Sequence, residues 1–368
     1  MNRIPAGIQE LFLALASMAS LMLTDCLVFA EERAGLGTDE RIKAFCIDFN
    51  WMKGSTFATP GLYAQASPEA HLQWYRDLGV NTIQTFCVSC NGYSWYRGTV
   101  APVQPDMKGD FLKEITELGH QAGMRVMGYF CIGANAFWGE TRPRLSYGNP
   151  RNKTHIPLTS EYLDYLCAEI EDVLTVTDID GFMIDWMFHV IHFDRLRWMP
   201  CEQEMYRELF GEPFPGKDAV DEKREIEFRR RAVARAWSRI YETAKSIKPD
   251  CILWLSSHQL DHPQVTGLAM FGEVDWLMNE HPDPAKIDAV RGAAGQHTRI
   301  IQCLSGWGEM HDADKLLSDP RFGNAGFYGF AIPSPVTTLP PTAQEDPSLA
   351  GNARNIEIIR KAFTAKNP

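Results

Sequence analysis

The first indication of the fold is the stretch Ala44-Phe-Cys-Ile-Asp-Phe-Asn50. The residues Trp51-Met-Lys-Gly54 follow it directly. The first part is an apolar run of strand length, so it predicts a first β-strand. A doubly wound open sheet that binds a nucleotide places a glycine-rich turn after such a strand. The turn is missing here, and no G-x-G-x-x-G or P-loop motif occurs anywhere in the chain. This favours a closed barrel over an open sheet.

After that strand, predicted strands and helices alternate to the end of the chain. The seven further strands are expected at 80–88, 125–132, 181–187, 252–256, 274–278, 299–304 and 326–332. The clearest helices start at capping residues, namely Ser67 before Pro68, Asp110, and Thr159 or Ser160. Later helices are expected at 222–246 and 352–364, whereas the helix between 256 and 274 is poorly marked. Eight strand–helix units predict a single-domain α/β fold, a (β/α)8 TIM barrel over residues 42–368.

The N-terminus resembles a secretory signal peptide. Arg3 supplies a positive charge, Leu11 to Leu23 form a short apolar region, and Val28-Phe-Ala30 offers a cleavage site. Residues 1–30 are therefore expected to be a signal peptide and residues 31–41 a flexible segment. This predicts a secreted or periplasmic protein with no membrane span after removal of the signal.

Composition narrows the choice of partner. The formal net charge is −11, and nucleic-acid binders carry basic patches, so the charge argues against a nucleic-acid partner and none is predicted. Most of the nine cysteines lie in apolar runs and are expected to be small core residues. The lone C-x-x-C of Cys87 and Cys90 lacks the second pair of a zinc site and the context of a redox site, so no metal and no cofactor are predicted.

The run Asp180-Gly-Phe-Met-Ile-Asp-Trp186 carries the strongest chemical signal. Side chains alternate along a strand, so Asp185 is expected to point into the barrel mouth at the carboxyl end of its strand. Phe182, Ile184 and Trp186 share the other face and are expected to pack against the outer helices. Asp180 lies at the opposite end, where a structural role is expected.

A retaining glycosidase needs a second carboxyl group about 5 Å from its nucleophile. Glu280 follows the sixth predicted strand and is the first choice as acid/base. Its competitors are Asp275, Glu309 and Asp48. Asp48 also faces inward from the first strand, and it is favoured as a hydrogen-bonding partner for a sugar hydroxyl.

Aromatic, amide and imidazole side chains gather where the predicted strands end. Such groups stack on sugar rings and orient their hydroxyls. The residues expected to bind carbohydrate are Asp48, Asn91, Tyr93, Trp95, Tyr129, Trp186, His189, His258 and Trp307. Alternatively, Asp185, His189 and His192 have a spacing that suits a metal ion.

Three stretches resemble the hypothetical glycosyl hydrolase family 6, and more distantly the α-L-fucosidases of glycoside hydrolase family 29. They are 78–86, 91–96 and 123–130. The segment 180–186 is similar to the fourth strand of those fucosidases, which carries their aspartate nucleophile. The fucosidases have a His-His-Asp-Gly run after the second strand, where this chain has Ser89-Cys-Asn-Gly92. The resemblance implies a barrel, a retaining mechanism and Asp185 as nucleophile.

These observations predict a secreted glycoside hydrolase, retaining and α-L-fucosidase-like, that cleaves glycosidic bonds in a polysaccharide or glycan. Asp185 and Glu280 are its expected catalytic pair. Two alternatives remain open. One is a carbohydrate-binding barrel without activity, and the other is a metal-dependent hydrolase that uses Asp185, His189 and His192.

Overall fold

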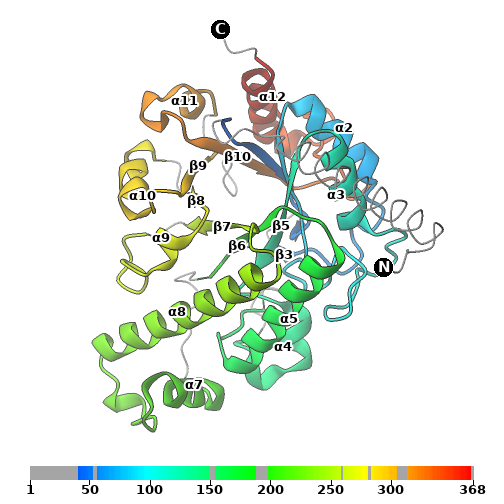
Figure 1. Cartoon of the computed structure of the whole chain (residues 1–368). Coiled ribbons are helices and arrows are strands. Elements are labelled where there is room, and N and C mark those ends of the chain that lie inside the picture. Colours follow the sequence, from blue (N-terminus) through cyan, green and yellow to red (C-terminus); the bar gives the residue numbers. More distant parts are fainter. Residues whose placement is uncertain are drawn as a thin grey trace, which may run out of the picture.

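The computed structural model describes residues 40–52, 56–148, 154–187, 198–257, 260–280, 283–304 and 313–365. Eight parallel strands close into a barrel surrounded by helices (Figure 1). The barrel strands are β1 (Lys43–Ile47), β4 (Thr82–Gln84), β5 (Arg125–Cys131), β6 (Gly181–Asp185), β7 (Ile252–Ser257), β8 (Trp276–Asn279), β9 (Arg299–Cys303) and β10 (Gly326–Ala331). The predicted (β/α)8 fold is confirmed.

The strands pair in the order β1-β10-β9-β8-β7-β6-β5-β4, and β4 returns to β1. The closing pair sets Lys43 against Phe327 and Ile47 against Ala331. Because all pairs are parallel, the carboxyl ends of all eight strands meet at one mouth. A short antiparallel hairpin, β2 (Trp51–Met52) with β3 (Thr56–Phe57), follows β1 beside that mouth.

The helices alternate with the strands as the sequence predicted. They are α2 (Pro68–Leu78), α3 (Phe111–Gln121), α4 (Ala136–Thr141), α5 (Ser160–Val176), α7 (Pro200–Phe210), α8 (Glu222–Ile247), α9 (Met270–Glu273), α10 (Ile287–Ala293), α11 (Ala313–Ser318) and α12 (Ala350–Thr364). Short 3-10 turns are η1 (Pro143–Leu145), η2 (Lys217–Ala219), η3 (Pro284–Lys286), η4 (Pro320–Phe322) and η5 (Pro347–Leu349). None of the helices in the described ranges is both long and apolar enough to cross a bilayer.

Helix ends follow their capping residues. The Ser67 hydroxyl accepts the amide hydrogen of Ala70 at 3.2 Å, and Gly79 ends α2 in the left-handed region at φ 82°. The helix between β7 and β8 gave no sequence signal because α9 is a single turn of four residues. Periodicity needs two or more turns before it becomes visible in a sequence.

The long insertion after β6 has a small core of its own. Trp198, Met205, Tyr206, Phe228 and Ala232 pack together between α7 and α8. In Figure 1, α7 and the first part of α8 lie away from the barrel, whereas the last part of α8 packs beside α5 against it. Burial of an aromatic cluster of this kind lets the insertion hold its shape outside the main core.

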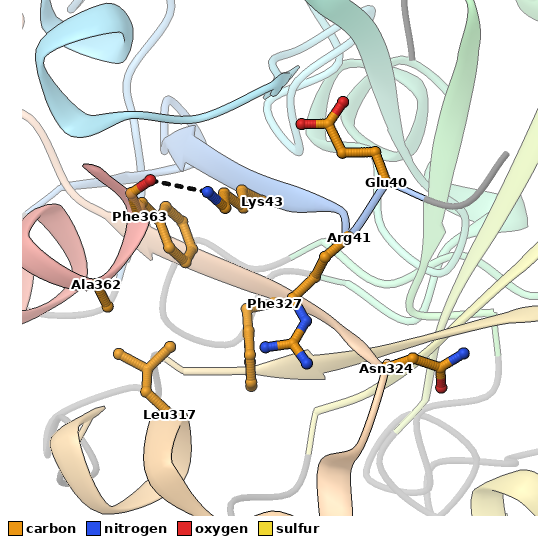
Figure 2. Close-up of a pocket in the computed structure, with 8 residues that line it drawn as sticks. All are labelled: Glu40, Arg41, Lys43, Leu317, Asn324, Phe327, Ala362 and Phe363. Carbon is orange, nitrogen blue, oxygen red and sulfur yellow. Dashed lines mark hydrogen bonds between the residues drawn. The ribbon is translucent and has the colours of Figure 1, made fainter. Parts of the chain in front are cut away.

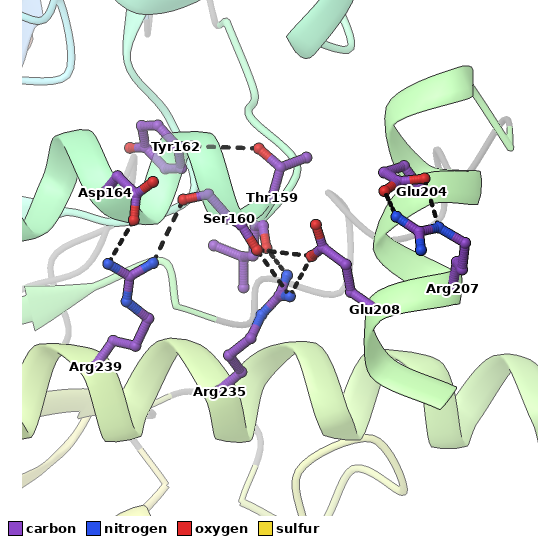
Figure 3. A network of polar contacts seen from close by, with 10 residues as sticks. Thr159, Ser160, Tyr162, Asp164, Glu204, Arg207, Glu208, Arg235 and Arg239 are labelled. Atoms are coloured by element: carbon purple, nitrogen blue, oxygen red, sulfur yellow. Dashed lines mark hydrogen bonds and ion pairs between the residues drawn. The ribbon is translucent and has the colours of Figure 1, made fainter. Parts of the chain in front are cut away.

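Polar contacts fasten the insertion to α5 (Figure 3). The Arg235 guanidinium contacts the Glu208 carboxylate at 2.6 Å and the Ser160 hydroxyl at 3.1 Å. Arg239 pairs with Asp164 at 2.7 Å. Half-exposed pairs of this kind contribute little energy each, so their main effect is to fix the orientation of α7 and α8 relative to α5.

Asp180 has the structural role that the sequence predicted. Its carboxylate accepts the Val126 amide hydrogen at 2.7 Å and contacts His120 at 2.9 Å. It thereby ties the start of β6 to β5 and α3, at the end of the barrel remote from the mouth.

Helix α5 carries one carboxyl group in an unusual environment. Glu169 is 1% exposed, and its pKa is raised to about 8. Burial is the main cause, the Tyr165 hydroxyl opposes it, and the Asp172 charge adds to it. A free glutamate ionises near pH 4.5. The folded protein therefore holds this proton more tightly than the unfolded chain does.

We predict that Glu169→Gln makes the protein less sensitive to alkaline pH. In the wild type, the stabilisation from the bound proton is complete below about pH 4.5 and is lost as the pH rises through about 8. Between pH 5 and pH 8.5, the free energy of unfolding of the wild type should therefore fall by roughly 3–5 kcal/mol more than that of the variant. Denaturant titrations at both values measure this. Exposed Glu171→Gln on the same helix is the control, and an equal pH dependence of wild type and Glu169→Gln would refute the assignment.

Candidate active site

A cavity opens at the carboxyl ends of the barrel strands and gathers three carboxylates. Asp48 comes from the end of β1, Asp185 is the last residue of β6, and Glu280 follows β8. The remaining lining residues are mostly aromatic, sulfur-containing or amide side chains, namely Cys46, Asn50, Trp51, Gln84, Phe86, Tyr129, Met183, Trp186, Ser256, Met278, Tyr328 and Phe330. The two residues expected to be catalytic therefore line one cavity.

Asp185 is half-buried and held by two donors. The Tyr129 hydroxyl donates to Oδ2 at 2.8 Å, and the Trp186 amide donates to Oδ1 at 2.9 Å. Tyr129 is fully buried and keeps its proton, because burial and the Asp185 charge raise its pKa well above the usual value. These two hydrogen bonds fix the plane of the carboxylate at the barrel mouth.

Glu280 extends from the loop after β8 toward the end of β7. The Ser256 hydroxyl donates to its Oε2 at 2.5 Å, and its own amide donates to the Ser257 carbonyl at 3.1 Å. The side chain is half-buried. A carboxyl group with one oxygen anchored and partial access to solvent can exchange a proton with a bound molecule and with water.

Asp48 is the most deeply buried of the three carboxylates, at 7% exposure. Its pKa is raised to about 7. Burial is the main cause, the hydrogen bond from the Asn50 amide opposes it, and the charges of Asp185 and Glu280 add to it. The Asn50 amide donates to Oδ1 at 2.8 Å. Near neutral pH, Asp48 therefore exchanges between an uncharged donor and a charged acceptor.

Trp186 departs from the alternation that the sequence suggested. Alternation along the strand predicted that it packs outward, and this is wrong, because its φ of 54° lies in the left-handed region and turns the side chain toward the mouth. It lines the cavity, where the sequence also suggested a carbohydrate-binding residue. Its ring lies 5.8 Å from Trp51, 5.9 Å from Phe57 and 5.6 Å from His155. Trp51, Phe57, His155 and Trp186 form an aromatic wall beside Asp185. Backbone strain of this kind often marks a functional site.

Three expected sugar-binding residues occupy other places. Trp95 is 2% exposed, stacks on Phe49 at 4.2 Å and donates to the Ser89 hydroxyl, so the structure moves it from the rim to the core. Asn91 is buried and braces the loop through the Ala58 carbonyl and the Tyr93 amide. Tyr93 packs edge-on against Phe137. None of the three is among the described residues that line the cavity.

The described residues do not include the remaining candidates from the sequence, namely His189, His192, His258, Trp307 and Glu309. Within the described ranges, no group of three or more His, Cys, Asp or Glu side chains is arranged to hold a metal ion.

Asp275 is excluded as a competitor of Glu280 by its position. It lies at the start of β8, where its carboxylate contacts Lys245 at 2.9 Å and accepts the Leu253 amide hydrogen at 2.8 Å. That end of the barrel is opposite to the mouth.

Sequence reasoning missed several lining residues. Tyr328 on β10 donates to Gln84 on β4 at 2.8 Å across the barrel, and Ser256 anchors Glu280. Ser256 and Tyr328 lie on barrel strands whose inward positions follow from alternation along the strand. The alternation that placed Asp185 at the mouth from β6 also predicts that Ser256 on β7 and Tyr328 on β10 point inward.

A second pocket lies at the other end of the barrel (Figure 2). Lys43 at the start of β1 donates to the Phe363 carbonyl at 2.8 Å, and Arg41 lies over the Phe327 ring at 5.4 Å. Side chains at the amino ends of barrel strands serve stability, whereas active sites form at the carboxyl ends. The carboxylate cavity is therefore the candidate active site.

One stretch of the chain matches a known protein family. Residues 67–186, about a third of the chain, match the family model of hypothetical glycosyl hydrolase 6. This segment runs from the start of α2 to Trp186 and includes Tyr129 and Asp185. No curated protein gives a significant sequence match.

Similar solved structures cover most of the chain. α-L-Fucosidase isoenzyme 2 from Paenibacillus thiaminolyticus has a TM-score of 0.63 at 17% identity, over 88% of this chain and 49% of that one. This chain thus spans about half of that fucosidase. The PgaB (BpsB) glycoside hydrolase domain from Bordetella bronchiseptica has a TM-score of 0.59 at 12% identity, over 89% and 99%. A family 29 α-L-fucosidase from Bacteroides thetaiotaomicron has a TM-score of 0.50 at 11% identity, over 90% and 73%.

At these identities the structural likeness establishes the fold. The matched family and the similar structures are all described as glycoside hydrolases, which is the enzyme class that the sequence resemblance implied. The resemblance is confirmed: residues 67–186 match a glycosyl hydrolase family, and the chain has the barrel fold of α-L-fucosidases.

Proposed function

We propose that this protein is a secreted, retaining glycoside hydrolase that acts on a glycan or polysaccharide in an α-L-fucosidase-like manner. The observation that carries the proposal is the convergence of Asp185 and Glu280 on one cavity at the carboxyl ends of the strands. Retaining glycosidases need two such carboxyl groups and no cofactor.

Asp185 is the nucleophile. Its carboxylate attacks the anomeric carbon and forms a covalent glycosyl-enzyme as the bond to the leaving oxygen breaks. The hydrogen bonds from Tyr129 and from the Trp186 amide orient the attacking oxygens. Orientation of this kind supplies a large part of the rate in intramolecular reactions.

Glu280 is the acid/base. In the first step it gives its proton to the leaving oxygen, and in the second it removes a proton from the water that releases the sugar. The Ser256 hydroxyl donates to one of its oxygens and so orients the carboxyl group within the cavity.

Asp48 and the aromatic wall bind the sugar. Asp48 faces the same cavity and serves as hydrogen-bonding partner to a sugar hydroxyl, in either protonation state. Trp186 and Trp51 offer aromatic faces for the apolar side of a sugar ring.

The comparisons support the retaining mechanism. The Bacteroides fucosidase was trapped as a covalent intermediate with 2-fluoro-fucosyl fluoride. A fucose-like substrate follows by analogy with the two fucosidases. Secretion rests on the predicted signal peptide at residues 1–30, which lies outside the described residues.

We predict that Asp185→Asn lowers kcat for aryl glycosides, α-L-fucoside included, on the order of 10⁴-fold, because the covalent step is lost. Glu280→Gln should lower kcat less for a nitrophenyl leaving group than for an alkyl one, because a good leaving group needs little protonation. Surface Asp164→Asn, with the same chemical change, should keep wild-type kinetics. Activity retained by Asp185→Asn would remove Asp185 from the mechanism. A folded wild type that binds glycans but hydrolyses none would favour the non-catalytic barrel.

We also predict that Glu280→Gln lowers the pKa of Asp48 from about 7. The Glu280 charge disfavours ionisation of Asp48, so its removal stabilises the charged form. Titration of carboxyl-¹³C-labelled aspartate by NMR measures the change, with Asp164→Asn as the control that leaves the Asp48 titration in place. An unchanged or higher pKa would show that the two carboxylates do not interact.

A further inference from the structure

The pocket at the amino end of β1 lies on the outer side of the barrel wall (Figure 2). Its volume is about 490 Å³, which falls within the range of small-molecule sites. Residues of β1 and β10 line one side of it, and residues of α11 and α12 line the other. The lining residues are Glu40, Arg41, Lys43, Leu317, Asn324, Phe327, Ala362 and Phe363.

Strand geometry brings two cations and an aromatic ring together in this pocket. Arg41 and Lys43 are two residues apart at the start of β1, so their side chains leave the chain on the same face. Lys43 is paired in register with Phe327 on β10, and the Arg41 guanidinium lies 5.4 Å from the centre of the Phe327 ring. The neighbouring inward residues, Cys46 and Tyr328, line the carboxylate cavity instead.

No described carboxylate pairs with these two cations. The Lys43 ammonium donates to the Phe363 carbonyl at 2.8 Å, and the Arg41 guanidinium donates to the Gly323 carbonyl. Glu40 is the one acidic residue among the described lining residues, and its carboxylate accepts the Asn81 side-chain amide at 3.2 Å. In Figure 2 the Glu40 carboxylate and the Arg41 guanidinium point in opposite directions. The pocket therefore keeps a positive charge in a protein whose formal net charge is −11.

The deep part of the pocket is apolar. Phe327 and Phe363 are only 3% and 4% exposed, and Leu317 on α11 lies beside them. A small inorganic anion would leave this surface without a partner, whereas an anion that carries a ring would cover it.

We propose that this pocket binds a small organic anion with an apolar ring, of the aromatic carboxylate class. The Arg41 guanidinium and the Lys43 ammonium hold the carboxylate, and the ring packs against Phe327 and Leu317. Each cation has donor hydrogens beyond the one that it gives to a carbonyl, and the planar guanidinium matches the two oxygens of a carboxylate.

The test is a titration of the full chain with sodium benzoate at constant ionic strength, followed by saturation-transfer difference NMR. We expect saturable binding with a dissociation constant on the order of 1 mM, because so small a ligand makes few contacts. Benzyl alcohol has the same ring without the charge, and it should bind at least about tenfold more weakly.

Two variants test the cations separately. Lys43→Met keeps the length of the side chain and removes its charge, and Arg41→Gln removes the guanidinium. Each should weaken benzoate binding about tenfold. Arg41 is exposed, so Arg41→Gln keeps the proposal testable if loss of the bond to Phe363 destabilises Lys43→Met. Lys113→Met, on the exposed face of α3, is the matched control and should bind benzoate like the wild type.

Thermal unfolding gives a second readout. A ligand that binds only the folded chain stabilises it, so benzoate at about ten times its dissociation constant should raise the Tm of the wild type by roughly 2 °C. The shift should be much smaller for Arg41→Gln at the same concentration.

The proposal would be overturned by a wild type that shows no saturable binding, by equal binding of benzyl alcohol, or by wild-type affinity in either charge variant. The pocket shares no lining residue with the carboxylate cavity, and neither readout depends on glycosidase activity. The result is therefore independent of the proposed function.

Discussion

The pairing of β1 with β10 closes the barrel, and the site depends on that closure. It sets Ile47 opposite Ala331, and the Asp48 amide continues the ladder by donating to the Ala331 carbonyl at 2.9 Å. Asp48 is thereby placed at the mouth together with Asp185 and Glu280, which come from distant parts of the chain. In an open sheet β1 would have an unpaired edge, and the three carboxylates would not form one ring.

Three carboxylates close together at a partly buried mouth repel one another and lose hydration, which costs free energy. Each of them is stabilised in a different way. Asp185 accepts two hydrogen bonds, and Glu280 accepts one from Ser256. Asp48 is buried deepest, and its raised pKa lets it take up a proton near neutrality. The site thus combines two carboxylates held by hydrogen bonds with one deeply buried carboxyl group that exchanges its proton near neutral pH.

The sequence predicted the features that follow from regular periodicity. Alternation placed Asp185 at the mouth, and the strand–helix pattern gave the barrel. Alternation along the strand failed at Trp186, whose positive φ turns its side chain into the mouth, although the residue itself was among those expected to bind carbohydrate. The expected position of Trp95 at the rim is also wrong, because its ring stacks on Phe49 in the core.

The most direct test of the central claim is the site of covalent labelling. The wild type is incubated with 2-deoxy-2-fluoroglycosyl fluorides, the fucosyl compound included, and the labelled peptide is identified by mass spectrometry. We expect one sugar per chain, in ester linkage to Asp185. A sugar on Asp48 or Glu280 would contradict it, and so would an enzyme that hydrolyses the parent glycoside but is never labelled.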